Sequence, residues 1–589
     1  MDGDLVTIKV SKGTLALAGI TKTGSGLGEQ LQNLSLTDDS FNGASVSITA
    51  KPHALVAGGP IRGDGSVNVG EISGGGNSLG AVAVAGDLGR ITAGGPAGLA
   101  SLTVGSMGRF GTSTGAANLS SVVGKMGKLT IRTDLDQAAI FAPSGIASIV
   151  IGGSLIGGSA ADSGSLISSI GSFPSVKIGG SLRGGTGDDT AKISAFISLG
   201  SVTIAGSVYG GASSQDIGNG LDGQIHSNVI GSVKIGGSLV GGSAPRSAQI
   251  KSFTTIGSVT IGGSLLGGTA FDAGSIIADD VIGTIKIAGD LKGGMGDRAG
   301  RIHGNTNITS VTVGGSLIGG TFAETGEIRA DFKLGKVTIG QNIVGTDVSG
   351  NASLDRAGYV DGDQISSVTI GGSIIAGKNT GTGLLTNSGG IRARHDLGSV
   401  IVKGSLIGNA TNNVTIAALG QAAPAGSDLA IKSVSVTGSA LFAEILAGYD
   451  HDNTTSGRGV ATDPDAQIGS VAIGGDFTSS SIVAGVTSGT DAFFGDANDA
   501  AIAGGNANIF SSIASVVIKG QALGTIAAGD AARFGIVAQS LGGVKIGAAK
   551  IPLLAGPGTD TFAAGKAQIL GPSLGTFNTD GFDLHAAEV

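Results

Sequence analysis

A glycine-rich phrase recurs through the middle of this chain at a nearly fixed spacing. From Ser175 to Gly185 it is Ser-Val-Lys-Ile-Gly-Gly-Ser-Leu-Arg-Gly-Gly, and related phrases begin 26 or 31 residues after one another. A repeat of this length is typical of a solenoid, in which each copy forms one coil and stacks on its neighbours. The copies begin at Ser175, Ser201, Ser232, Ser258, Thr284, Ser310 and Lys336.

Within one copy, the order of apolar residues and glycines predicts short strands separated by bends. Val259 and Ile261 flank the polar Thr260, an alternation that indicates a strand with one face turned inward. Paired glycines then allow a bend, after which Leu265 begins a second strand and Ile276 a third. We therefore expect three short strands in each coil of about 26 residues.

Equivalent positions carry the same kind of side chain from copy to copy. Val202 and Val233 share one position of the first strand, and Ile250 and Ile276 share one of the third. Strands that stack about 4.8 Å apart would line these side chains up into a continuous core. Because such coils return in the same direction, and parallel crossovers are nearly always right-handed, we predict an all-β fold, a right-handed parallel β-helix solenoid.

A serine follows the first glycine pair in most copies, as at Ser181, Ser207 and Ser238. We expect these serines to stack near a corner of the coil and to accept hydrogen bonds from the amides of the bend. A catalytic serine would need a base within hydrogen-bond reach, and no histidine recurs with this position.

The regularity of the repeat changes along the chain and suggests five segments. They are an N-terminal strand or cap segment (1–50), an irregular solenoid of short coils (51–145), a regular solenoid (146–412), a solenoid with long loop insertions (413–543) and a C-terminal cap (544–589).

Composition excludes several classes of protein. The chain has 112 Gly, 40% hydrophobic residues and 13% charged residues, which disfavours disorder, and it has no Cys to form disulfides. A net charge of −8 argues against nucleic-acid binding, and no apolar run is long enough to span a membrane. The first residues are not a signal peptide. We expect a fragment of a longer protein that is extracellular or on the cell surface.

Four segments resemble a known group of repeat proteins: Ala85–Gly94 (AGDLGRITAG), Gly474–Val486 (GGDFTSSSIVAGV), Gly489–Asp496 (GTDAFFGD) and Ile513–Thr525 (IASVVIKGQALGT). They are similar to the C-terminal region of large β-strand-repeat proteins of Verrucomicrobia and Planctomycetes, most of which are uncharacterised and are taken to be exported. The resemblance covers most of the chain. It implies a repetitive β fold and a surface location, and it implies no catalytic residues.

Many β-helices cleave polysaccharides, but the residues for that chemistry are missing here. Pectin-type hydrolases resemble one another in a set that includes Gly-His-Gly and Arg-Ile-Lys, and this chain contains neither. Glycoside hydrolysis needs two carboxyls about 5–9.5 Å apart. The outward positions of the first strand carry Lys and Thr, and the chain has three Tyr and no Trp to stack on sugars. We predict that the protein is not an enzyme.

One column of the third strand is rich in basic residues and is expected to face outward. Such a column could follow an anionic surface glycan, or it could be a solvated face with scattered charge. Identical subunits are the other partner that we consider. The candidate binding residues are His226, Lys251, His303, Arg329 and Arg392.

Two loops are rich in aspartate, whose hard oxygens suit Ca²⁺. Aspartate is also a common turn residue, so these loops have an alternative explanation. We expect no other cofactor. The first loop also contains Asp463 and Asp465, and the candidate calcium ligands are Asp450, Asp452, Asp491, Asp496 and Asp499.

These observations favour a non-catalytic structural or adhesive module of a bacterial surface or secreted protein. One alternative is a carbohydrate-active β-helix protein, degrading or binding polysaccharide, with a site in the loops between about 440 and 510. Another is a self-assembling extracellular filament subunit.

Overall fold

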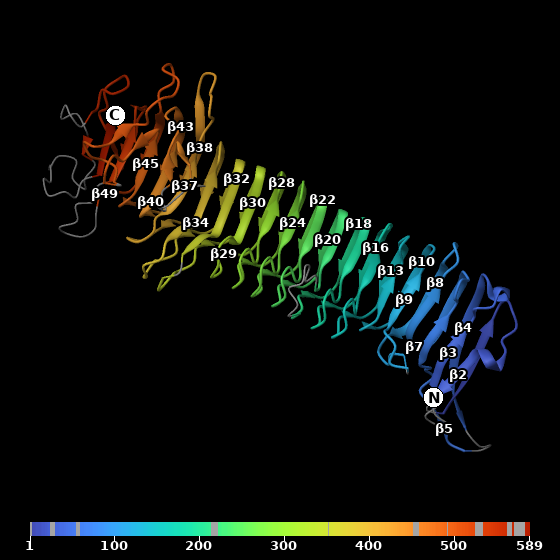
Figure 1. Ribbon diagram of the computed structural model, residues 1–589. Coiled ribbons are helices and arrows are strands. Elements are labelled where there is room, and N and C mark those ends of the chain that lie inside the picture. The colour runs from blue at the N-terminus through green and yellow to red at the C-terminus, as the bar shows by residue number, and fades with distance from the viewer. Residues whose placement is uncertain are drawn as a thin grey trace. The chain divides into compact units, whose positions relative to one another are not determined.

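The protein folds almost entirely into β-strands. The computed structural model describes residues 3–23, 30–54, 59–112, 114–213, 222–351, 353–450, 459–491, 493–524, 534–561, 568–569 and 584–589 (Figure 1). Helical structure in these residues is limited to two single turns, η1 (Leu17–Gly19) and η3 (Asp39–Phe41). The chain divides into two compact units, Met1–Ile282 and Gly283–Val589. The expected all-β fold with many parallel strands is confirmed.

In the first unit, long strands stack in parallel and in register. Val202 in β18 (Ile193–Ile204) pairs with Val233 in β20 (Ile225–Ile235), which pairs with Val259 in β22 (Ile250–Ile261) (Figure 1). The predicted 31- and 26-residue offsets are therefore the offsets of the strand pairing itself. Short strands stack in the same way: β17 (Leu182–Arg183), β19 (Val208–Tyr209), β21 (Leu239–Val240) and β23 (Leu265–Leu266).

The division into three separate strands holds only in part. β15 (Leu166–Ser168) and β16 (Ser172–Ile178) are distinct, as expected. In β18, by contrast, the third segment of one copy continues into the first segment of the next, with a register shift between Ala195 and Ser198. An irregularity of this kind bends a strand without ending it, so two of the expected strands become one.

The second unit repeats this arrangement with growing offsets. The column of its first strands runs Val311, Val337, Val368, Val400, Val434, Val471 and Val516. These residues lie in β28 (Asn307–Val313), β30 (Thr325–Ile339), β32 (Leu354–Ile370), β35 (Leu397–Val402), β38 (Asp428–Val436), β43 (Ala466–Ile473) and β48 (Ser512–Ile518). Each is at most 1% exposed. Burying one such side chain is worth about 1.5–3 kcal/mol, so the column is a main source of stability.

The bends are held by backbone contacts and by a ladder of side chains. A Cβ on Gly236 would lie 2.1 Å from the carbonyl oxygen of Ala205, so only glycine fits against the coil before it. The Oγ of Ser181 accepts the backbone N–H of Ser207, and the Oγ of Ser207 accepts that of Ser238. In the second unit, Oδ1 of Asn342 accepts the N–H of Ser373 in the same manner. The structural role expected of the serine column is confirmed.

Antiparallel pairs occur in the segments expected to be caps. Near the N-terminus, β1 (Asp4–Val10) runs antiparallel to β4 (Ala44–Ala54), and β2 (Ile20–Thr23) to β3 (Gln30–Ser35). Near the C-terminus, β52 (Val544–Ile546) pairs with β53 (Ala549–Lys550), and β54 (Gln568–Ile569) with β55 (Leu584–Glu588). The five-segment division itself stays a prediction.

The third strand is covered on one face in most described coils of the first unit and on both faces in much of the second; in the first unit, β24 (Ile276–Ala278) is buried at every residue. In β20 its residues alternate between buried and half-buried, whereas every residue is buried in β34 (Leu385–Ala393), β37 (Val414–Ala418), β40 (Ala443–Ala447) and β45 (Ser481–Ala484). One column of the latter strands is apolar, with Ala417, Leu446 and Val483 paired in succession. Tyr449 and Phe494, from the long loops, pack against this column and form one buried apolar cluster with it. The loop insertions therefore close over the third strand.

Candidate functional site

In the first unit, the predicted basic column is aligned but carries little free positive charge. Ser194 pairs with His226, and His226 with Lys251. Burial, with the nearby charge of Lys192, lowers the pKa of His226 to about 4, so this ring is neutral at pH 7. Lys251 forms an ion pair with Asp279. Neither residue therefore offers an unpaired cation to an anionic ligand.

In the second unit, the same column becomes a buried ion network. His303 pairs with Arg329, Arg329 with Asp361, and Asp361 with Arg392. Nε and Nη2 of Arg392 lie 3.0 and 2.8 Å from Oδ1 and Oδ2 of Asp361. The expectation that this column faces outward is wrong here, because Asp361 and Arg392 are 0% and 1% exposed.

Acidic neighbours also occupy the other cations of this network. Nη2 of Arg394 lies 2.9 Å from Oδ2 of Asp361. Asp331 is 2.7 Å from Nε of Arg329 and 3.1 Å from Nε2 of His303. Burial raises the pKa of the Asp331 carboxyl, but its hydrogen bonds to His303 and Arg329 lower it more, so the group stays ionised. The structure thus brings His303, Arg329 and Arg392 together as a paired network.

Glu327 lies beside this network, and the sequence analysis did not single it out. It is fully buried in β30, and neither carboxyl oxygen has a hydrogen-bond partner. Burial raises the pKa of Glu327 to about 7, and the charges of Asp361 and Glu324 add to the effect. No sequence signal distinguishes it, because its burial and its neighbour Asp361 depend on the next coil.

Those candidate calcium ligands that the structure describes are not grouped into one metal site. Asp450 lies in β41 (Tyr449–Asp450), opposite Val460 of β42 (Val460–Ala461), and Asp452 lies outside the described residues. Asp491 accepts hydrogen bonds from the N–H of Phe493 and the amide of Asn498. Over the described ranges, no three His, Asp or Glu side chains are grouped so as to hold a metal ion. Calcium binding by this set stays a prediction.

Asp496 and Asp499 both lie in the loop that follows Asp491. The N–H of Gly495 donates to Oδ2 of Asp499 at 2.6 Å, whereas Oδ1 of Asp499 is buried with no hydrogen-bond partner. Burial raises the pKa of Asp499 to about 7, and Asp496 contributes to the shift. The hydrogen bond from Gly495 to Asp499 therefore lies within the same loop.

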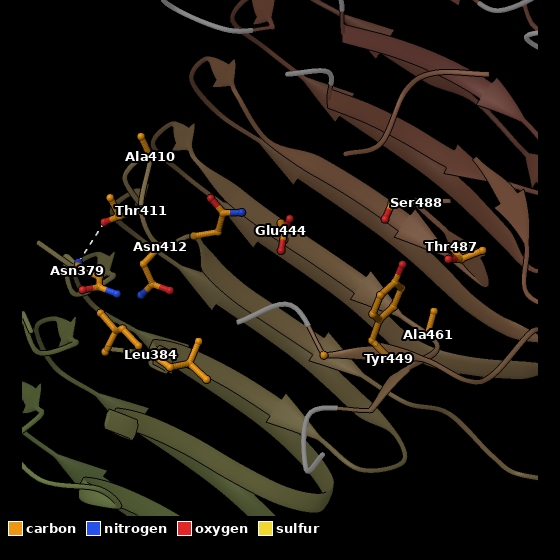
Figure 2. A pocket seen from close by; sticks show the side chains of 13 residues that line it. Asn379, Leu384, Ala410, Thr411, Asn412, Glu444, Tyr449, Ala461, Thr487 and Ser488 are labelled. Carbon is orange, nitrogen blue, oxygen red and sulfur yellow. Dashed lines mark hydrogen bonds between the residues drawn. The ribbon is translucent and has the colours of Figure 1, made fainter. Parts of the chain in front are cut away.

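A polar groove in the second unit is the strongest candidate for a ligand site. Its volume is about 420 Å³, and it lies where the loops that follow several stacked strands meet. Figure 2 shows Glu444 between two groups, with Asn379, Thr411 and Asn412 on one side and Tyr449, Thr487 and Ser488 on the other. Its remaining lining residues are Leu384, Leu385, Ala410, Asn413, Gly459 and Ala461.

The walls of the groove are fixed by internal hydrogen bonds. Nδ2 of Asn379 donates to the carbonyl of Gly383 at 2.7 Å, and Nδ2 of Asn412 donates to that of Gly377 at 3.2 Å. The hydroxyl of Tyr449 donates to the carbonyl of Val486 at 2.6 Å. Tyr449 is 3% exposed, so it supports the wall and does not present a ring face for stacking.

Charge restricts what the groove can hold. Glu444 pairs with Thr415 and Ser481 of the neighbouring strands and is buried except where it borders the groove. None of the described lining residues is basic. Amides, hydroxyls and one carboxylate suit a neutral polyhydroxy ligand or a cation, and they disfavour an anion.

The sequence indicated part of this site. Glu444, Tyr449, Thr487 and Ser488 fall within the loops between about 440 and 510 that we considered for a carbohydrate site. Asn379 and residues 410–413 were not identified from the sequence. Their loops differ in length, so the repeat does not align them with one another.

Comparison with protein-family models, curated proteins and solved structures returns no match to this chain. The similarity to exported repeat proteins therefore stays a prediction. In the described residues, no helix has the length and apolar character needed to cross a membrane.

Proposed function

We propose that the chain is a non-catalytic structural or adhesive module of an exported bacterial protein, and that each unit winds as a right-handed parallel β-helix. The observation that carries this proposal is the in-register stacking of equivalent residues in both units, such as Val202 on Val233 and Val337 on Val368. Stacked coils of this kind give a stiff support on which loops are displayed. The handedness follows from the general preference of parallel crossovers.

The adhesive part of the proposal rests on the groove around Glu444. Its amide, hydroxyl and carboxylate lining can exchange hydrogen bonds with the hydroxyls of a neutral glycan. Internal hydrogen bonds hold Asn379 and Asn412 in place, which limits the ordering cost of binding.

The same groove argues against glycan cleavage. Hydrolysis by the usual route requires two carboxyls across the scissile bond, about 5–9.5 Å apart. Glu444 is the only carboxyl among the described residues that line the groove. Binding without turnover is therefore the function that this geometry supports best.

A binding screen against neutral and acidic glycans tests the proposal. We expect a neutral glycan to bind, Glu444→Gln and Asn413→Ala to weaken the binding, and Lys251→Leu in the first unit to leave it unchanged. Depolymerisation assays on the same glycans form the second arm. Turnover that Glu444→Gln abolishes would contradict the non-catalytic assignment, and binding that survives both groove substitutions would contradict the site.

A further inference from the structure

The first unit contains a cavity of its own, with a volume of about 440 Å³. Gly86 and Gly105 line it, and they come from the paired strands β7 (Leu79–Ala93) and β8 (Leu99–Met107). A Cβ on Gly105 would lie 2.8 Å from the carbonyl oxygen of Gly86, so a larger residue would clash with the strand before it. Bare backbone therefore forms part of the cavity wall and leaves room for a ligand.

A buried carboxylate holds the segment that forms another wall of this cavity. Asp87 is 2% exposed. Its Oδ1 accepts the hydroxyl of Ser106 at 2.6 Å and the N–H of Arg109 at 3.2 Å, and its Oδ2 accepts the N–H of Phe110 at 3.0 Å. These hydrogen bonds satisfy both oxygens of Asp87 and fix the backbone that carries Arg109 and Phe110. The wall is therefore in place before a ligand arrives, which limits the ordering cost of binding.

Arg109 and Phe110 are the exposed part of this wall. The Phe110 side chain is 56% exposed, and the guanidinium carbon of Arg109 lies 5.5 Å from the centre of its ring. Within the described residues, Arg109 forms no ion pair, although Asp64 and Asp87 also line the cavity. Asp64 instead accepts the N–H of Ser66 at 2.8 Å. A cation and an apolar ring therefore lie side by side, and both are open to a ligand.

The other polar groups of the cavity suit a ligand rich in hydroxyls. The side-chain amide of Asn68 has no hydrogen-bond partner among the described residues, in contrast to that of Asn379 in the groove of the second unit. The hydroxyl of Thr133 donates to the carbonyl of Gly105 at 3.0 Å and can still accept a hydrogen bond. Asn68 and Thr133 thus supply both donors and acceptors beside Arg109.

We propose that this cavity binds a short segment of an acidic glycan, with a uronate carboxylate on Arg109 and the apolar face of the sugar ring on Phe110. Guanidinium pairs with carboxylate through two parallel hydrogen bonds, which a neutral sugar cannot form. Asp64 opposes an anion from another part of the wall, so it limits the affinity without removing the preference that Arg109 creates. The site lies wholly in the first unit and does not rest on the proposed function.

Calorimetric titration with trimers of galacturonate, glucuronate and mannuronate tests the proposal. We expect at least one trimer to bind with a Kd of about 1 mM or lower, and the binding to weaken as NaCl is added, because salt screens an exposed ion pair. The methyl ester of that trimer keeps the sugar rings but loses the charge, and it should bind at least about tenfold more weakly. Equal binding of the ester, or no binding of any trimer up to about 10 mM, would overturn the proposal.

Variants of exposed side chains locate the site while keeping the β-type circular dichroism spectrum. Arg109→Gln should weaken binding of the acidic trimer at least about tenfold and remove its advantage over the ester, and Phe110→Ala should weaken it about two- to tenfold. Asp64→Asn should strengthen it, because a repelling charge is lost. Glu444→Gln, which tests the neutral-glycan groove of the second unit, should leave it unchanged, so the two proposals fail separately. Binding of the acidic trimer that Arg109→Gln retains in full would place the ligand elsewhere and overturn the proposal.

Discussion

The third strand is built differently in the two units, although it occupies the same place in the repeat. In the first unit its outer column carries His226 and Lys251, which are half-buried and reach solvent, and then Ile277, which is buried. In the second unit the column begins half-buried at His303 and Arg329 and then passes through Asp361 and Arg392 to Ala417 and Leu446, all four of which are buried. The comparison teaches that the inner face of a coil is fixed by the repeat, whereas the outer face depends on what the loops cover.

Whether an outer position is exposed to solvent or covered by other segments decides which side chains it tolerates. A solvated position accepts a neutral histidine or a loosely paired lysine at little cost. A covered position must carry either a charge that is ion-paired, as Arg392 is with Asp361, or an apolar side chain, as at Leu446. The groove around Glu444 forms where this cover begins, because Tyr449 both packs on the apolar column and lines the groove.

The largest expected effect comes from placing a charge under the cover. Leu446→Lys buries an ammonium against Val483 and Phe494, and it should destabilise the second unit by more than about 4 kcal/mol. Urea unfolding followed by circular dichroism measures the change. A loss below about 1 kcal/mol would mean that the loops do not close over this column.

Removing one partner of the buried ion pair should cost nearly as much. Arg392→Ala leaves the carboxylate of Asp361 buried with weaker compensation from Arg394, and we expect a loss of about 3–5 kcal/mol in urea unfolding. The double variant Asp361→Asn/Arg392→Met, which removes both charges, should recover much of that loss. If the double variant is no more stable than Arg392→Ala, the cost is one of packing and not of charge.

Glu327 predicts a pH dependence of stability. Its pKa rises from 4.5 to about 7 on folding, so the folded unit favours the protonated acid. The stability it confers is complete below pH 4.5 and is lost as the pH rises to about 7, a change of about 3 kcal/mol.

A series of unfolding curves between pH 4.5 and 8 measures this effect. Glu327→Gln should flatten the profile and be more stable than the wild type at pH 8, whereas Glu327→Asp keeps a titratable group and should keep a slope. An unchanged slope in Glu327→Gln would assign the pH dependence to another group.

The smallest effect is expected in the first unit. Lys251 forms its ion pair with Asp279 at a surface where the two side chains are 19% and 38% exposed. Lys251→Leu should therefore change stability by less than about 1 kcal/mol, in contrast to the reverse exchange at Leu446. A loss as large as that of Leu446→Lys would remove the distinction between the two units.

Much of the inner face could be predicted from the sequence, and little of the outer face. The spacing of Val202, Val233 and Val259 predicted their pairing, and the serine position predicted the ladder at Ser207. Burial of Arg392 could not be predicted, because the repeat places it in the same column as the half-buried Lys251 and its partner Asp361 comes from the neighbouring coil.

The groove could not be predicted from the sequence for a related reason. Asn379 and Thr487 both line the groove, although their loops lie far apart in the sequence. A periodic pattern aligns residues at equal offsets, whereas these residues are brought together at unequal offsets.

Cross-linking of paired cysteines tests the stacked register most directly, because the chain has no native Cys. Thr203 of β18 pairs with Lys234 of β20 on the outer face of the first strand. Thr203→Cys/Lys234→Cys should form an intramolecular disulfide on mild oxidation, since in-register neighbours lie about 4.8 Å apart. Thr203→Cys/Ser232→Cys, two residues out of register, should not, because the added offset of about 7 Å exceeds disulfide reach. Equal or preferential cross-linking of the second pair would contradict the account.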